Sequence, residues 1–184
     1  MIVNNFIILN KKMNGGIDLN IKFNKEPVTL VGSQVKVGEK AKPFKAVKND
    51  LSEFNSEDYK GKILVYSVVP SIDTGVCSLQ ARTFNEDATK LGDDVVVVTI
   101  SNDLPFAQKR FCATEGIDNS MIISDYKDHE FGEKYGFLMK ELMLLARGVV
   151  VVDKEGNISY VEYVEEVTNE VDFEKAIEAV KKLK

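Results

Sequence analysis

Residues 62–77 decide the fold, and they read KILVYSVVPSIDTGVC. The first eight form a short run rich in apolar and β-branched side chains, which is typical of a strand covered on both faces. Pro70 ends that run, and the turn-forming residues after it lead into a helix that starts at about Val76. A buried strand that passes directly into a helix indicates an α/β domain, where ligands bind at the carboxyl ends of the strands.

Three more strand-like runs follow, at residues 94–101, 121–124 and 148–153. The first of the helical patterns between them covers residues 76–91, where five residues recur near helical spacing: Val76, Leu79, Thr83, Ala88 and Leu91. The alternation of strands and helices predicts a central mixed β-sheet with helices on both faces.

A second helical pattern covers residues 104–115. Asp103 and Pro105 are typical of a helix start, and Gly116 is typical of the position just after a helix end. This helix carries Cys112, and the helix before it carries the other cysteine of the chain.

The C-terminal part predicts one more strand and one more helix. Residues 158–164 form the second arm of a hairpin with the strand before them. An amphipathic helix then starts at Asn169 or Val171, and one of its faces carries three apolar residues, Phe173, Ile177 and Val180.

The N-terminal part lies outside this alternation. Residues 1–16 look like a loose leader, and residues 17–23 and 27–31 predict a β-hairpin that decorates the domain without joining its core. Because no internal repeat or long linker follows, we predict a single domain over residues 17–184.

The composition excludes several functions. The chain has 24 basic and 29 acidic residues and a net charge of -5, so we expect no nucleic-acid partner. The apolar run at residues 6–9 is far too short to span a membrane and lacks the features of a signal peptide, which favours a cytoplasmic protein with no membrane partner. Two cysteines and the single histidine, His129, cannot supply the four ligands of a structural zinc site.

Cys77 is the main candidate for chemistry. Asp73 or Thr74 can cap the helix, which places Cys77 in its first turn, where free N–H groups and the helix dipole favour an anion. A thiolate in such a place is a nucleophile. The alternative is that Cys77 is an ordinary small buried residue, but its position after a turn at a helix start favours a reactive thiol.

Two segments identify a family resemblance: PSIDTGVC at residues 70–77 and DLPFAQKRFC at residues 103–112. Together they resemble the thiol peroxidase subfamily of the peroxiredoxins, and the similarity extends over roughly residues 20–180. The resemblance implies a thioredoxin-like fold and an antioxidant enzyme that reduces hydrogen peroxide and organic hydroperoxides. It also implies that no bound cofactor is needed.

The resemblance assigns roles to three residues of the first segment and to Arg147, which lies further along the chain. Cys77 would be the peroxidatic cysteine, whose thiolate attacks the peroxide and becomes a sulfenic acid. Thr74 would hydrogen-bond that thiolate, and Pro70 would shield and shape the turn. Arg147 would bring a permanent positive charge to the same pocket.

The resemblance also implies that the second segment supplies the residue that completes the catalytic cycle. Cys112 would be the resolving cysteine, which forms an intramolecular disulfide with Cys77, and a thioredoxin-type protein would reduce that bond. A disulfide requires Cα atoms within about 7 Å, so we expect at least one helix to open during turnover. The family suggests a homodimer, and three apolar residues suit either an interface or the core: Leu138, Met139 and Met143.

Two other readings compete with a peroxidase. A thioredoxin-like disulfide oxidoreductase requires a Cys-x-x-Cys pair, but Thr74 and Gln80 occupy the two possible partner positions. A redox sensor would oxidise once without turnover.

His129 is predicted to be a surface residue, because no catalytic constellation can be built around it. Gly148 departs from the family pattern, in which a residue with a side chain commonly follows the arginine.

Overall fold

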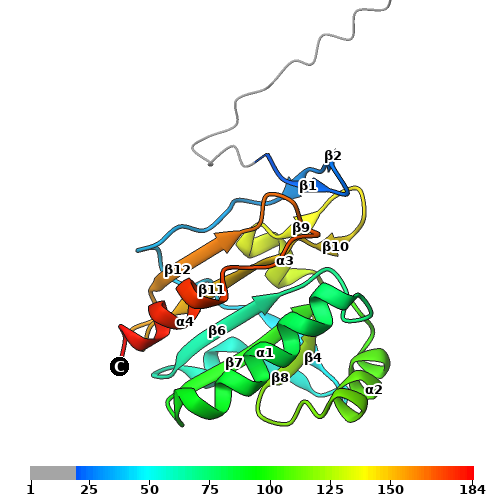
Figure 1. Cartoon of the computed structure of the whole chain (residues 1–184). Helices are drawn as coiled ribbons and strands as arrows, with labels where there is room; N and C mark the ends of the chain where they lie inside the picture. The colour runs from blue at the N-terminus through cyan, green and yellow to red at the C-terminus, as the bar shows by residue number, and fades with distance from the viewer. Residues whose placement is uncertain (1–19) are drawn as a thin grey trace, which may run out of the picture.

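The computed structural model describes residues 20–184, which form a seven-stranded mixed β-sheet with helices on both faces (Figure 1). The strand order is β12-β11-β6-β7-β8-β4-β5. These strands are β4 (Lys45–Lys48), β5 (Glu53–Asn55), β6 (Ile63–Val68), β7 (Val95–Ser101), β8 (Met121–Ser124), β11 (Gly148–Val152) and β12 (Ile158–Tyr163). The predicted mixed sheet is therefore confirmed.

The centre of the sheet is built from parallel strands. β6 pairs with β7, and β7 pairs with β8, in parallel. The two crossovers between them contain helix α1 (Gly75–Leu91) and helix α2 (Pro105–Glu115). The predicted C-terminal hairpin is also present, because β11 and β12 pair antiparallel. All six residues of β6 are buried, as the apolar run predicts.

Each face of the sheet has its own apolar core. Alternate residues of β6 point to opposite faces, so Ile63 and Val65 belong to one core and Leu64 and Tyr66 to the other. Helices α1 and α4 (Phe173–Lys181) cover the Ile63 face, and they lie in front of the sheet in Figure 1. On the other face, α3 (Glu130–Tyr135) packs its aromatic residues against Tyr66.

The N-terminal hairpin is shorter than predicted. Only β1 (Lys22–Phe23) and β2 (Glu26–Pro27) pair with each other, and β3 (Leu30–Val31) joins a separate sheet with β9 (Leu138–Met139) and β10 (Leu144–Leu145). The prediction that this part only decorates the domain is wrong, because Ile21 is buried in the main core. The predicted leader at residues 1–16 lies outside the described residues.

Two helix predictions need correction. The buried face of α1 carries Cys77, Gln80, Ala81 and Phe84, whereas Leu79, an apolar member of the predicted helical pattern, is 38% exposed. The face is rotated because polar Gln80 has a buried hydrogen-bonding role. The last helix, α4, starts at Phe173 and not at Asn169 or Val171, because the Asp172 side chain accepts a hydrogen bond from the Lys175 N–H and caps it there.

Some elements had no clear sequence signal. The β4–β5 hairpin, the short 3-10 helix η1 (Ser56–Tyr59) and α3 each have few residues, so their periodicity is weak. Among residues 20–184, no helix combines the length and apolar character needed to cross a membrane.

Candidate active site

Cys77 lies in the first turn of α1, after the loop that leaves the carboxyl end of β6. Its side chain is fully buried, and the Thr74 hydroxyl donates a hydrogen bond to its sulfur at 2.7 Å. Thr74 occupies the N-cap position of the helix, but its side chain makes no capping hydrogen bond. The hydroxyl that was predicted either to cap the helix or to serve the site therefore contacts the sulfur.

Arg147 approaches the same sulfur from the loop between β10 and β11. Its side chain is 2% exposed, and its guanidinium Nη2 lies 3.2 Å from the Cys77 sulfur. Nε donates to the Val167 carbonyl at 2.8 Å, and Nη1 donates to the Gln80 side-chain oxygen at 2.9 Å. No carboxylate within residues 20–184 forms an ion pair with this guanidinium.

The lack of an acidic partner leaves the Cys77 sulfur as the group that faces the Arg147 charge. A buried positive charge is costly unless a negative charge compensates it. The atom placed to carry that negative charge is the Cys77 sulfur, which also accepts the Thr74 hydrogen bond. Two hydrogen-bond donors, from Thr74 and Arg147, therefore meet at one sulfur.

Gln80 is a site residue that the sequence pattern does not predict. It is 1% exposed, and its amide nitrogen donates to the Ser67 hydroxyl at 2.9 Å while its oxygen accepts from Arg147. Gln80 therefore orients the guanidinium from the helix that carries Cys77. A polar residue one helical turn after the cysteine, on the same face, was the available signal.

Asp103 holds the loop before Cys77 in place. Its carboxylate accepts hydrogen bonds from the Ser71 hydroxyl and the Ile72 N–H, both at 2.8 Å, and from the Ser101 hydroxyl at 2.6 Å. The sequence predicts Asp103 at the start of α2, but the N-cap residue of that helix is Leu104. Asp103 therefore links the loop before Cys77 to the segment that leads to Cys112.

Two other residues shape the surroundings. Pro70 is buried two residues after the end of β6, near the start of the loop that leads to Cys77. Gly148 follows Arg147, and a Cβ atom there would lie 2.0 Å from the Glu162 carbonyl oxygen and 2.7 Å from the Phe137 ring. The departure of Gly148 from the family pattern therefore allows close approach of β12 to the strand that follows Arg147.

Cys112 lies on α2 and is half-buried. Its hydrogen-bond partner is the Asn49 amide, 3.6 Å from the sulfur, and neither cysteine forms a disulfide. Burial raises the pKa of the Cys112 thiol, so it stays protonated at neutral pH. Phe111, its neighbour, packs against the small apolar cluster that contains Cys77.

The remaining sequence candidates have clear positions. His129 is half-buried and not fully on the surface, and its Nδ1 lies 3.3 Å from the Asn102 amide nitrogen. Leu138 and Met139 are buried in the core, whereas Met143 is 48% exposed. Of these three apolar residues, only Met143 is exposed for an interface.

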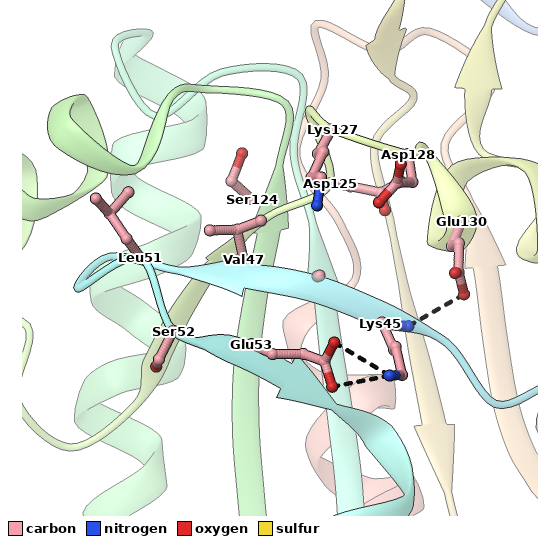
Figure 2. Close-up of a pocket in the computed structure, with 11 residues that line it drawn as sticks. Lys45, Val47, Leu51, Ser52, Glu53, Ser124, Asp125, Lys127, Asp128 and Glu130 are labelled. Atoms are coloured by element: carbon pink, nitrogen blue, oxygen red, sulfur yellow. Dashed lines mark hydrogen bonds and ion pairs between the residues drawn. The ribbon is translucent and has the colours of Figure 1, made fainter.

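A pocket lies between the β4–β5 hairpin and the turn before α3 (Figure 2), and none of the residues that contact the Cys77 sulfur lines it. It has a volume of about 150 Å³, and Lys45 at its edge contacts Glu53 and Glu130. Asp125 lines it, and its carboxylate accepts hydrogen bonds from the N–H groups of Phe131 and Gly132. Burial nevertheless raises the pKa of Asp125 to about 6.

This raised pKa predicts a pH-dependent stability that Asp125→Asn removes. Between the ordinary pKa of about 3.9 and the folded value, the folded state binds the proton more tightly than the unfolded state. The free energy of unfolding should therefore fall, by up to about 3 kcal/mol, as the pH rises from 4 to 7. Urea unfolding of both proteins across this range measures the difference, and parallel profiles would contradict the prediction.

Comparison with known proteins agrees with this architecture. The Redoxin family matches residues 36–179. The thiol peroxidase of Bacillus subtilis is 55% identical over 163 residues, which cover 89% of this chain and 97% of its own length. The thiol peroxidase of Oceanobacillus iheyensis is 52% identical over 163 residues, covering 89% of this chain and 99% of its own.

Solved structures support the same assignment. A peroxiredoxin-like protein from Aquifex aeolicus superimposes with a TM-score of 0.85 at 38% identity, over 92% of this chain and all of its own. The chain belongs to the redoxin family. Within that family it groups with the thiol peroxidases, as its sequence predicts, and its thioredoxin-like α/β fold is confirmed.

Proposed function

We propose that the protein is a thiol-dependent peroxidase that uses Cys77 as its peroxidatic cysteine. The observation that carries this proposal is the buried Arg147 guanidinium, which has no acidic partner among the described residues and lies 3.2 Å from the Cys77 sulfur. The activity agrees with the names of the relatives, which are thiol peroxidases at more than half identity.

In the first step, the Cys77 thiolate attacks the distal oxygen of a hydroperoxide. The O–O bond breaks and an S–O bond forms, so the sulfur is oxidised by two electrons to a sulfenic acid. The leaving oxygen departs as an alkoxide or hydroxide and takes up a proton to give an alcohol or water. Arg147 and Thr74, which donate to the sulfur, stabilise the charge as it moves from sulfur to oxygen.

In the second step, the Cys112 thiol condenses with the sulfenic acid. An S–S bond forms, and the sulfenic oxygen leaves as water. The two cysteines belong to different helices, and Cys112 contacts Asn49 instead of Cys77 in the described state. We therefore propose that α1 or α2 opens locally to bring the Cα atoms within disulfide range.

A thioredoxin-type dithiol protein then reduces the disulfide by thiol exchange, which returns both cysteines to thiols. Pro70 shapes the turn before Cys77 in this scheme. The chemistry uses only the two cysteines and the dithiol partner, so the cycle requires no bound cofactor.

Replacing Cys112 with Ser tests this cycle. The variant should consume one equivalent of hydrogen peroxide per chain and then stop in a thioredoxin-coupled assay, because no disulfide can form for thioredoxin to attack. The parent protein should continue over many turnovers. Full recycling of Cys112→Ser by thioredoxin would remove the resolving role of Cys112.

The same assay separates a peroxidase from a redox sensor. A sensor would oxidise once even in the parent chain with thioredoxin present, whereas sustained consumption of peroxide identifies an enzyme.

We also propose a cytoplasmic location, with neither nucleic acid nor membrane as partner. The net charge of -5 supports the exclusion of nucleic acid.

We propose that the protein forms a homodimer through a surface near the active site. Asn102 donates a hydrogen bond to the Met143 carbonyl at 2.7 Å and so ties two loops together. Large exposed apolar side chains lie on or next to these loops: Leu104, Phe106, Leu142 and Met143. Such a group of apolar side chains suits a protein interface. Sedimentation equilibrium of the parent and Phe106→Glu tests this, and a monomeric parent at micromolar concentration would contradict it.

A further inference from the structure

A second, larger cavity lies on the sheet face opposite α1. It has a volume of about 430 Å³, which is in the range of small-molecule sites. Leu64 and Tyr66 of β6 and Val152 of β11 line it, and all three belong to the core on that face. The cavity also borders residues 60–62, just before β6, whereas the loop to Cys77 leaves the other end of that strand.

The Tyr66 hydroxyl lacks a hydrogen-bond partner within residues 20–184. The side chain is 1% exposed, and the rings of Phe44 and Tyr135 pack edge-on against it. Within residues 20–184, the polar side-chain atoms that have no partner and no contact with solvent belong to Thr99, Asn102 and Gln108. The Tyr66 oxygen therefore keeps some contact with solvent. Its access to solvent therefore comes through the cavity that it lines.

The Tyr66 hydroxyl differs in this respect from two neighbouring hydroxyls in the cavity wall. The neighbouring Tyr135 hydroxyl already donates to the Lys42 carbonyl at 2.9 Å, and the Ser56 hydroxyl accepts from the Phe44 N–H at 3.0 Å. A buried hydroxyl without a partner is unfavourable, so a ligand atom that hydrogen-bonds to Tyr66 would gain binding energy.

The lining of the cavity is rich in positive charge. Five lysines and three acidic residues line it, in a chain whose net charge is -5. Lys60 pairs with Glu57, and Lys154 pairs with Asp94. The other three lysine ammoniums donate only to backbone carbonyls, at 2.7 to 2.9 Å, and have no carboxylate at ion-pair distance within residues 20–184: Lys40, Lys42 and Lys62.

Two of the three acidic residues are engaged, and counting the third, Glu155, still leaves the lining with an excess of two positive charges. Glu57 is occupied by Lys60, and the Asp153 carboxylate accepts hydrogen bonds from the Asn157 main chain and side chain. Lys40 lies close enough to Asp153 to help lower its pKa, although hydrogen bonds from Asn157 contribute more. An anion at the mouth of the cavity is therefore attracted by lysines that lack a carboxylate partner.

We propose that this cavity binds a small organic anion with an apolar body, such as an aromatic or short aliphatic carboxylate. The body packs against Tyr66, Tyr135 and Leu64, and the polar groups of the ligand contact the Tyr66 hydroxyl and the lysines at the rim. The site is independent of Cys77, because no residue that contacts the Cys77 sulfur lines the cavity.

Titration of the ¹⁵N-labelled full chain with 4-phenylbutyrate tests the proposal. Saturable shifts are expected at the amide signals of Gly61 and Gly156, which line the cavity. The neutral analogue 4-phenylbutanamide should bind about tenfold more weakly, because it lacks the charge. Two results would overturn the proposal. One is the absence of saturable shifts up to about 20 mM 4-phenylbutyrate, and the other is equal binding of the acid and the amide.

Two variants identify the groups involved. Tyr66→Phe removes only the hydroxyl and should weaken 4-phenylbutyrate binding about tenfold. Lys40→Gln should weaken it about threefold, whereas Lys181→Gln, which makes the same charge change on α4, should bind like the parent. If Tyr66→Phe folds poorly, Lys40→Gln still tests the site. Unchanged binding of 4-phenylbutyrate to Lys40→Gln, or to a folded Tyr66→Phe protein, would contradict the proposed binding site.

Discussion

Cys77→Ser should lose at least about a thousandfold of the peroxidase activity, because a serine hydroxyl is not ionised at neutral pH and is a poor nucleophile toward peroxide. Thr74 and Arg147 would still face this position, but they would have no sulfur to activate. The loss should appear in the second-order rate of hydrogen peroxide consumption, measured with excess thioredoxin and its reductase.

Cys112→Ser is the matched control, because it also replaces one sulfur with oxygen. It should keep a fast first oxidation and lose only the recycling. Thermal unfolding of both variants reports whether the fold is intact. A Cys77→Ser protein that keeps more than about a tenth of the parent rate would show that another group attacks the peroxide.

Arg147→Gln should lower the second-order rate of Cys77 oxidation by about a hundredfold or more. Glutamine keeps hydrogen-bonding capacity but removes the charge that faces the sulfur at 3.2 Å. The Val167 carbonyl would also lose its Nε donor, so the free energy of unfolding should fall by about 1 to 3 kcal/mol. Arg147→Lys should give an intermediate rate, because a lysine keeps the charge but cannot reach all three acceptors at once.

Arg82→Gln controls for the change in net charge. Arg82 lies on α1, the helix that carries Cys77, but it pairs with Glu115 and remains partly exposed, so its loss should leave the rate within about twofold. Stopped-flow measurement on the Cys112→Ser background isolates the first step. An Arg147→Gln rate equal to that of Arg82→Gln would contradict a role for the guanidinium in the reaction.

The strands and crossover helices around Cys77 could be predicted from local sequence. Apolar β-branched runs and helix boundary residues identify β6, β7, β8, α1 and α2 to within one or two residues. The face of α1 could not be predicted, because Leu79 is apolar and Gln80 is polar, yet Gln80 is buried. Its burial depends on Arg147, a residue distant in the sequence.

Contacts of this kind have no local signature. Periodicity places Cys77 at a helix start, but the approach of Arg147 to it became predictable only through the family resemblance. Asp103 likewise resembles a helix-start residue, and its hydrogen bonds to Ser71 and Ile72 depend on the packing of neighbouring strands. The cavity lined by Tyr66 depends on four separate segments that meet only in the folded chain.

The site as a whole combines a sulfur, a hydroxyl and a buried cation from two distant parts of the chain. Thr74 and Cys77 come from the same helix start, and Arg147 comes from the loop before β11. Gln80 fixes the guanidinium and is itself anchored to Ser67 on β6. The buried network therefore holds the charge beside the sulfur before any peroxide arrives, and in the proposed reaction this preorganisation would lower the barrier.

Trapping of the sulfenic acid tests the central role of Cys77 most directly. Cys112→Ser is mixed with one equivalent of hydrogen peroxide and an excess of dimedone, quenched at times from milliseconds to minutes, and mapped by mass spectrometry. We predict that the adduct forms on Cys77 at least about a thousandfold faster than on free cysteine. A Cys77 that stays unmodified, or that reacts no faster than free cysteine, would contradict the account.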